Sequence, residues 1–136
     1  MADVFSPAKR SAIMRAVRSR HTTPEKLARR IMRRLGVKFR GHSAALPGAP
    51  DLSVAAARRA IFIHGCFWHG HDCARGDRLP KTNQAYWRAK IARNRARDRR
   101  NLAALRRLGW RALVLWECAL KDERATERRL ARFLKL

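Results

Sequence analysis

The feature that most restricts the fold of this chain is a buried strand followed directly by a cluster of side chains that can bind metal. Ile61, Phe62 and Ile63 form a continuous apolar run, which is typical of a strand covered on both faces. The ten residues that follow, "HGCFWHGHDC" (residues 64–73), hold three of the five histidines and two of the three cysteines. These are more ligands than one ordinary metal site needs. The fold must bury this strand and also place the additional ligand side chains.

Two helices are predicted before this strand. The first starts at Ser6-Pro7 and covers about residues 6–20. The second starts at "TTPEK", where Thr22 stands three residues before Glu25, the spacing of a capping box, with a proline in the first turn. Its apolar residues recur every four positions and a glycine ends it: Leu27, Ile31, Leu35 and Gly36.

The middle of the chain predicts a hairpin and then a long helix. A short extended piece near residues 37–40 is followed by the loop "GHSAALPGAP". "DLSVA" and "AIFIHG" are predicted to be two strands joined by a tight turn around Ala57-Arg58. A helix over about residues 82–108 follows and is closed by Gly109.

The last part adds one strand and one helix. "WRALVLWE" is predicted to be another buried strand, and a basic helix runs on from Asp122, with Leu130, Phe133 and Leu134 as its apolar contacts. This order of elements predicts one α/β domain over residues 1–136, with helices packed on a small mixed sheet.

Two polar residues interrupt the apolar stripe of the long helix. Between its apolar positions, Trp87, Ile91, Leu102 and Leu105, stand Asn94 and Asp98. Polar residues on a packing face indicate a buried hydrogen bond or a helix that emerges over a groove. A partly solvated middle of the helix is an equally good interpretation of the spacing alone.

The charge of the chain points to a polyanionic partner. Against 33 Lys and Arg stand only 10 Asp and Glu, for a formal net charge of +23. Such a surplus attracts polyanions, and nucleic acid is the usual one. Coding bias could contribute to the excess of arginine, but the electrostatic field exists whatever its origin.

The sequence also predicts where the protein is found. The opening "MADVFSPAKR" has no apolar signal-peptide core, and no stretch reaches the ~20 apolar residues of a membrane span. Three cysteines cannot all pair with one another, so we expect a soluble intracellular protein.

The cysteines and histidines predict a metal site. Structural zinc takes four ligands, mostly thiolates and imidazoles, and the three cysteines supply all the thiols of the chain. One histidine completes the set, and His71, one residue from a cysteine, is the favoured fourth ligand: Cys66, His71, Cys73 and Cys118. The alternative is a set of buried free cysteines, against which the local density of ligands argues. His64 and His69 are then left for proton transfer.

Asp51 starts the strand that pairs with the histidine-bearing strand. A carboxylate beside histidines in so basic a chain suggests a Mg²⁺ site for phosphate chemistry, because Mg²⁺ prefers oxygen ligands and often holds only one or two carboxylates. By spacing alone, an aspartate that starts a strand is more often a turn residue.

Several segments resemble the very short patch repair endonucleases of bacteria, which are DNA mismatch endonucleases with a restriction-endonuclease-like fold. The segments run in order along nearly the whole chain: "AIMRAVRSRHTTPEKLAR", "PGAPD", "IFIHGCFWHGHDC", "PKTN", "YWRAKIARNRARDRR" and "LGWRALVLWEC". The resemblance implies that Asp51 and the backbone carbonyl of Ile63, where many relatives have Thr, bind Mg²⁺. It gives His64 and His69 catalytic roles, with Glu25 as a supporting acid, and puts structural Zn²⁺ on the four ligands named above.

Two departures from the relatives accompany this resemblance. The wider nuclease fold usually carries Glu-x-Lys on its second motif strand, where this chain has Phe62-Ile63-His64. Gly70 and Asp72 flank His71, where some relatives have more histidines. Either catalytic imidazole could serve the attacking water or the leaving group.

The resemblance also assigns DNA contacts. Phe67 and Trp68 are expected to insert beside a mismatch from one groove and Met14 from the other, since apolar wedges between base steps unstack DNA. Core packing is the usual alternative for an aromatic pair. Lys90 and Asn94, one turn apart on the long helix, are expected to read the mispair.

We therefore expect a Mg²⁺-dependent, zinc-containing endonuclease that nicks one DNA strand beside a T:G mismatch, the product of 5-methylcytosine deamination. Its expected partners are mismatched double-stranded DNA and other mismatch-repair proteins, with no membrane partner. It is expected to act as a monomer in the bacterial cytoplasm, at the nucleoid. The alternatives are a non-enzymatic zinc DNA-binding module and a nuclease of the same fold with a different mismatch or duplex target.

Overall fold

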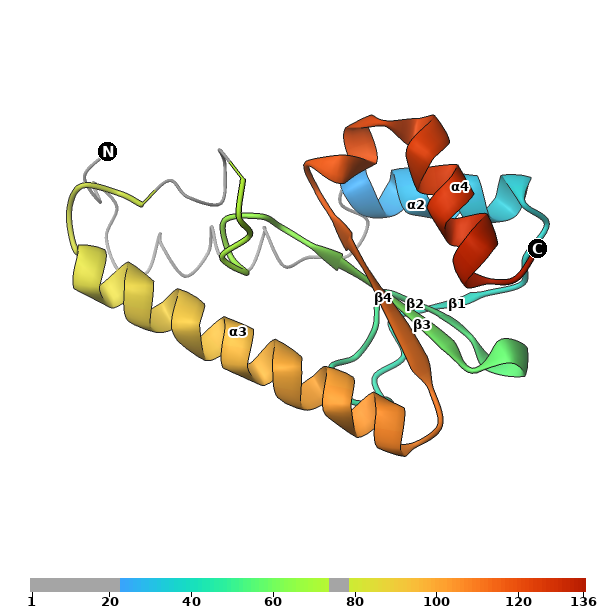
Figure 1. Ribbon diagram of the computed structural model, residues 1–136, viewed down its shortest axis with the longest axis horizontal. Helices are drawn as coiled ribbons and strands as arrows, with labels where there is room; N and C mark the ends of the chain where they lie inside the picture. The colour runs from blue at the N-terminus through green and yellow to red at the C-terminus, as the bar shows by residue number, and fades with distance from the viewer. Residues whose placement is uncertain (1–22, 74–78) are drawn as a thin grey trace.

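Four strands form one mixed sheet at the centre of the molecule (Figure 1). The computed structural model describes residues 23–73 and 79–136. The first predicted helix, with Met14, and Thr22 of the capping box lie outside these residues. In spatial order the strands are β1 (Arg40–Gly41), β2 (Leu52–Val54), β3 (Arg59–His64) and β4 (Arg111–Trp116). The predicted small mixed sheet is confirmed.

Pairing within the sheet changes direction at β3. Strand β2 pairs with β3 antiparallel, and the two are joined by a short 3₁₀ turn at Ala55–Ala57 and by Arg58, whose φ of 52° is left-handed. Strand β4 pairs with β3 parallel, with His64 opposite Trp116 at its end. The tight turn predicted around Ala57-Arg58 is therefore confirmed, and the ends of β3 and β4 lie side by side.

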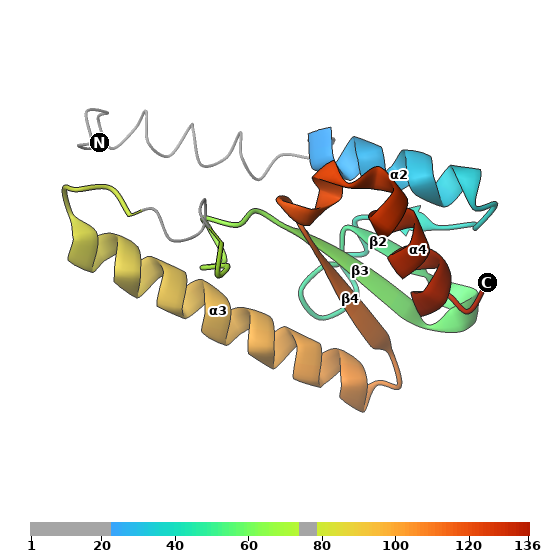
Figure 2. The same ribbon diagram turned by 45° about the horizontal axis from the view of Figure 1, so that its top comes forward.

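Helices cover both faces of the sheet (Figures 1 and 2). Helices α2 (Thr23–Arg34) and α4 (Glu123–Phe133) pack on one face, and α3 (Gln84–Arg107) packs on the other. Because successive strand residues point to opposite faces, Ile61 joins the core under α2 and α4, while Phe62 packs with Leu105 of α3. The apolar run of β3 is thus covered on both sides, as its sequence predicted.

Strand β4 differs from its prediction as a buried strand. Leu115 is fully buried, but Leu113 and Val114 are only half-buried. Among the described strands β4 lies at the edge of the sheet and pairs with β3 alone. The apolar run of β4 therefore indicates contacts on both faces of the strand, but the strand is not fully buried.

The helix ends follow the local chemistry of the sequence. Gly36 and Gly109 stand just beyond α2 and α3 with φ values of 74° and 84°, in the left-handed region where glycine carries no steric cost. At the start of α4 the side chain of Asp122 accepts a hydrogen bond of 3.0 Å from the backbone N–H of Ala125. The predicted ends of these helices are confirmed to within two residues.

Helix α3 positions the functional groups. Its 24 residues span about 36 Å, so it reaches well past the sheet (Figures 1 and 2). Its last turns pack on β3 and β4, and its first half runs beneath the loop that leaves β3. None of the described helices is apolar enough over a sufficient length to cross a bilayer.

Candidate active site and metal centre

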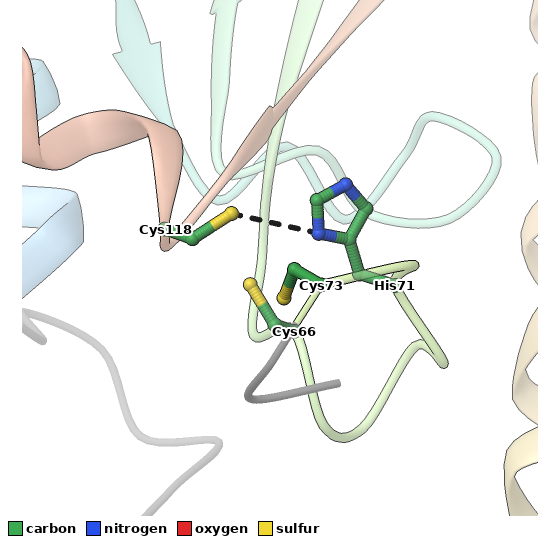
Figure 3. Close-up of side chains that lie close together, drawn as sticks. All are labelled: Cys66, His71, Cys73 and Cys118. Atoms are coloured by element: carbon green, nitrogen blue, oxygen red, sulfur yellow. Dashed lines mark hydrogen bonds between the residues drawn. The ribbon is translucent and has the colours of Figure 1, made fainter. Parts of the chain in front are cut away.

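Three cysteines and one histidine converge beyond the paired ends of β3 and β4 (Figure 3). Because His64 is opposite Trp116, Cys66 and Cys118 each follow two residues beyond the same register position. The loop after β3 then folds back, with the backbone N–H of His71 donating to the carbonyl of Cys66 at 2.9 Å. The four ligand atoms, of Cys66, His71, Cys73 and Cys118, lie within 4.8 Å of one another.

The chemistry of this group suits a structural zinc ion. Three thiols and one imidazole are a common tetrahedral donor set. Burial raises the pKa of the Cys66 thiol to about 12, so a thiolate at this position needs a cation beside it. His71 is held by its ring, which stacks on Trp116 with centroids 4.1 Å apart. The sequence favoured His71 over His69 as the fourth ligand, and it is His71 that joins the cysteines.

His69 belongs to a second group with His64 and Asp98. The rings of His64 and His69 are stacked, with centroids 3.8 Å apart and planes 4° from parallel. Nδ1 of His69 lies 2.6 Å from Oδ2 of Asp98 on α3. Burial, followed by the nearby charge of His69, lowers the pKa of His64 to about 4. These two histidines, which lie outside the cysteine cluster, therefore form a stacked pair with one carboxylate partner.

A third group gathers Glu25, His42 and Asp51. Glu25 lies in the first turn of α2 and is buried, with 3% of its surface exposed. Nε2 of His42 lies 2.9 Å from Oε1 of Glu25. Oδ2 of Asp51 accepts a hydrogen bond of 2.7 Å from the backbone N–H of Ile63. The ligand atoms of the three side chains lie within 4.8 Å of one another.

Within this group, Asp51 has a shifted pKa. Burial raises its pKa, and the neighbouring charge of Glu25 raises it further, while the N–H of Ile63 and the charge of His42 lower it. The carboxylate of Glu25 thus disfavours the charged form of Asp51 in this buried place. A cation between them would relieve that repulsion, so this group suits a divalent metal ion.

The second and third groups face one cavity. A cavity of about 710 Å³ is lined by Glu25, His42 and Asp51 on one side and by His64, His69 and Asp98 on the other. Helix α3 adds polar groups to the wall, including Asn94 and Asn101. One hollow thus combines a carboxylate cluster that suits a cation with imidazoles able to move a proton.

Comparisons with known proteins agree on one family. A sequence profile described as "DNA mismatch endonuclease Vsr" matches residues 2–75. The "Type II nicking enzyme V.XorIIP" of Xanthomonas oryzae pv. oryzae is 48% identical over 134 residues, covering 98% of each chain. The "DNA mismatch endonuclease Vsr" of Escherichia coli is 46% identical over 134 residues, covering 94% of this chain and 85% of the relative. This chain belongs to the Vsr family of DNA mismatch endonucleases.

Membership of the Vsr family makes the chain a DNA endonuclease, a hydrolase of phosphodiester bonds. The resemblance identified from the sequence is confirmed at the level of the family.

The aromatic pair predicted to contact DNA lies beside α3. The rings of Phe67 and Trp68 are 5.0 Å apart, and each contacts Trp87 of α3, at 5.7 and 5.9 Å. Both side chains are half-buried. In this Vsr protein the pair therefore rests on one helix and is neither a core element nor fully exposed.

Asn94 supports the loop that carries this pair. Its Nδ2 donates to the backbone carbonyl of Trp68 at 2.8 Å, and its Oδ1 accepts from Nη2 of Arg97 at 3.1 Å. The polar interruption of the α3 stripe is thus a buried hydrogen bond, one of the interpretations that the sequence allowed. Lys90, one turn earlier, is half-buried.

Two residues of these groups were not selected from the sequence. His42 stands in a loop that was recognised only by its glycines and prolines. Asp98 was noticed as a polar residue on a packing face, with no role assigned. The available signal was the spacing from Asn94 to Asp98, which puts both on the face of α3 toward the loop after β3.

Proposed function

We propose that this Vsr enzyme nicks one strand of double-stranded DNA beside a T:G mismatch and so starts a short repair patch where 5-methylcytosine has deaminated. The observation that carries the proposal is the shared cavity, in which the Asp51 cluster faces the pair of His64 and His69. The names of the relatives, "DNA mismatch endonuclease" and "nicking enzyme", support the same reaction.

Asp51 and the backbone carbonyl of Ile63 would hold Mg²⁺, with Glu25 as a supporting carboxylate. The burial of Asp51 and its raised pKa favour a bound cation over a bare charge. Bound there, Mg²⁺ would supply charge neutralisation for the scissile phosphate and a place for the attacking water. The N–H of Ile63, which donates to Asp51 at 2.7 Å, fixes the carboxylate in the cavity.

His69 would take the proton from the attacking water. With Nδ1–H donated to Asp98, the neutral ring carries its lone pair on Nε2, which can accept a proton. The carboxylate of Asp98 orients the ring and stabilises the imidazolium that forms. His64, stacked on His69, would assist the phosphate or the leaving oxygen.

Zn²⁺ on Cys66, His71, Cys73 and Cys118 would act structurally. The site ties the loop after β3 to the end of β4, and the same loop carries His69 and the Phe67-Trp68 pair. A metal ion bound here would hold the ring of His69 and the Phe67-Trp68 pair in fixed positions relative to each other. We further infer a restriction-endonuclease-like fold, for which the mixed sheet with Asp51 and His64 at its strand ends is the supporting observation.

The basic surface would bind the DNA backbone. Arginines along α3 are exposed, among them Arg88, Arg95 and Arg99, and the whole chain carries a formal charge of +23. We assign the mismatch contacts to Phe67, Trp68, Met14, Lys90 and Asn94. We also propose that residues 1–136 act as one domain and as a monomer in the bacterial cytoplasm, at the nucleoid, alongside other mismatch-repair proteins.

A cleavage panel tests this proposal. Duplexes that carry each of the mismatches in several flanking sequences, with either strand end-labelled, are incubated with the enzyme in the presence and absence of Mg²⁺. The expected result is a Mg²⁺-dependent cut in one strand beside T:G. Cutting of another mismatch or of matched duplex would show that the specificity is not for T:G. Binding without any cut would show that the protein is a DNA-binding module and not a nuclease.

A further inference from the structure

His42 contacts Asp51 through its backbone and the carboxylate of Glu25 through its ring. Strand β1 ends at Gly41, which is paired with Leu52 of β2, so His42 and Asp51 are the next neighbours across the two strands. The backbone N–H of His42 donates to the carbonyl of Asp51 at 3.0 Å. The backbone of His42 is left-handed, with φ 49°, and its ring reaches the carboxylate of Glu25 on α2, 2.9 Å away.

The three side chains are enclosed rather than solvated. The side chain of Glu25 is 4% exposed and that of His42 19% exposed, and both line the cavity together with Asp51. Their ligand atoms all lie within 4.8 Å of one another, close enough to share one ion. An imidazole nitrogen therefore stands among the carboxylate oxygens at the place where a catalytic cation is proposed.

An imidazole changes which cation such a site prefers. Mg²⁺ selects oxygen ligands and parts with its waters reluctantly. Divalent first-row transition metals accept imidazole nitrogen readily, with affinity rising from Mn²⁺ through Co²⁺. A nitrogen ligand added to two carboxylates therefore raises the affinity for a transition metal such as Co²⁺ more than the affinity for Mg²⁺.

We propose that Glu25, His42 and Asp51 form one mixed carboxylate–imidazole site that binds a divalent transition metal in preference to Mg²⁺. The inference rests on the proposed function, in which Asp51 is the ligand of the catalytic cation. It adds His42 as a ligand and a transition metal as the preferred occupant. A competing arrangement keeps His42 as a partner of Glu25 only, and then its removal changes the affinity for all divalent cations alike.

The test uses Co²⁺ binding to the zinc-loaded protein, measured by calorimetry and visible absorption. Mg²⁺ affinity comes from competition against Co²⁺. Cobalt bound to thiolates absorbs strongly in the near ultraviolet, so any exchange into the cysteine site is seen directly. In the wild-type protein we expect one Co²⁺ without this band, held much more tightly than Mg²⁺.

His42→Asn is the decisive variant, because Asn tolerates a left-handed backbone and presents an amide in place of the imidazole. The ratio of Mg²⁺ to Co²⁺ dissociation constants should fall by about tenfold or more, the loss typical of even a supporting residue around a metal. An unchanged ratio overturns the inference. His42→Gln is a second variant with the same expectation, and thermal unfolding of both confirms that they fold.

Two control variants separate the possible failures. His69→Asn disrupts a second group among the described residues that could hold a metal, made of His64, His69 and Asp98. If this variant loses Co²⁺ while His42→Asn retains it, the inference is wrong. Asp51→Asn should weaken Co²⁺ and Mg²⁺ together. If Asp51→Asn weakens both but His42→Asn does not shift the ratio, the proposed function stands without His42. If Asp51→Asn leaves both unchanged, the proposed catalytic site itself fails.

Discussion

His69 and Asp98 are 29 positions apart in the chain, yet Nδ1 of one lies 2.6 Å from Oδ2 of the other. The contact joins the loop after β3 to the middle of α3, and the ring of His69 is at the same time stacked on His64. A histidine held by a carboxylate on one nitrogen presents its other nitrogen in a fixed direction. This pair is therefore the strongest geometric argument for His69 as the general base.

Asp98→Asn should reduce nicking by about 10³-fold or more, because an amide can hold the wrong tautomer of the ring and cannot stabilise the imidazolium. His69→Ala should also lose cutting, with little change in affinity for mismatched DNA. Single-turnover cleavage and equilibrium binding measure the two effects separately. Glu127→Gln, which removes the same charge from a remote ion pair with Arg34, controls for net charge. A defect confined to affinity would contradict the general-base role.

Asp51→Asn should abolish nicking while mismatch binding survives. The amide keeps an oxygen that can accept the N–H of Ile63, so the local fold should persist, but the negative charge that favours a divalent cation is gone. Cleavage is measured across a Mg²⁺ titration, together with gel-shift affinity in the absence of metal. Residual cutting at more than about a few percent of the wild-type rate would mean that Asp51 is not the metal ligand.

The cysteine cluster should contain about one zinc per chain by elemental analysis, as expected of a closed four-ligand site. Cys73→Ala and Cys118→Ala should fold poorly, because binding of a structural zinc is part of the folding free energy. Thermal unfolding followed by circular dichroism measures the loss. Asp72→Ala, at an exposed position between two of the ligands, is the matched control and should unfold like the wild type. Metal-free protein that folds and cuts normally would rule out the assignment.

DNA binding should depend steeply on salt. With ~6–10 phosphate contacts, affinity should fall by about 10³- to 10⁵-fold between roughly 50 and 200 mM salt. The slope of log affinity against log salt concentration gives the number of contacts. Arg95→Ala or Arg99→Ala, two exposed residues of α3, should each reduce that slope by about one contact. A nearly flat response would mean that most of the +23 charge faces away from the DNA.

The fold was largely readable from local signals, whereas the site was only partly so. The continuous apolar run of β3 indicates that both of its faces are covered. Gly36 and Gly109 mark helix ends through their left-handed backbone, and Asp122 marks one through its side-chain cap. The partial exposure of β4 was missed because the position of a strand in its sheet depends on which partners it finds.

The missing members of the site have the same explanation. His42 reaches Glu25 because β1 pairs with β2 and α2 packs over the edge of the sheet at β1. Neither contact can be predicted from the residue spacing around position 42. Asp98 did leave a trace, as a polar residue on an apolar stripe. Its partner could not be named from the sequence, because the loop of His69 is brought to α3 by the whole fold.

Recognition of the mismatch should depend on the Phe67-Trp68 pair. A T:G pair is close enough in shape to a normal pair that deformability should carry part of the specificity, and mispaired steps cost less to unstack. Phe67 and Trp68, half-buried on Trp87, could leave this support to enter the duplex, and the bond from Asn94 to the Trp68 carbonyl would keep the loop in place. Replacing both aromatic residues with Ala should therefore damage mismatch cutting far more than general affinity for DNA.

The measurement is a competition between T:G duplex and matched duplex of the same sequence, with thermal unfolding to confirm that the double variant is folded. Lys90→Ala and Asn94→Ala serve as contrasts. They should relax the choice between T:G and other pairs, and Asn94→Ala should also loosen the aromatic loop, because it removes the bond to the Trp68 carbonyl. A double alanine variant that keeps the wild-type preference would show that Phe67 and Trp68 only pack against α3, and the intercalation hypothesis would then be wrong.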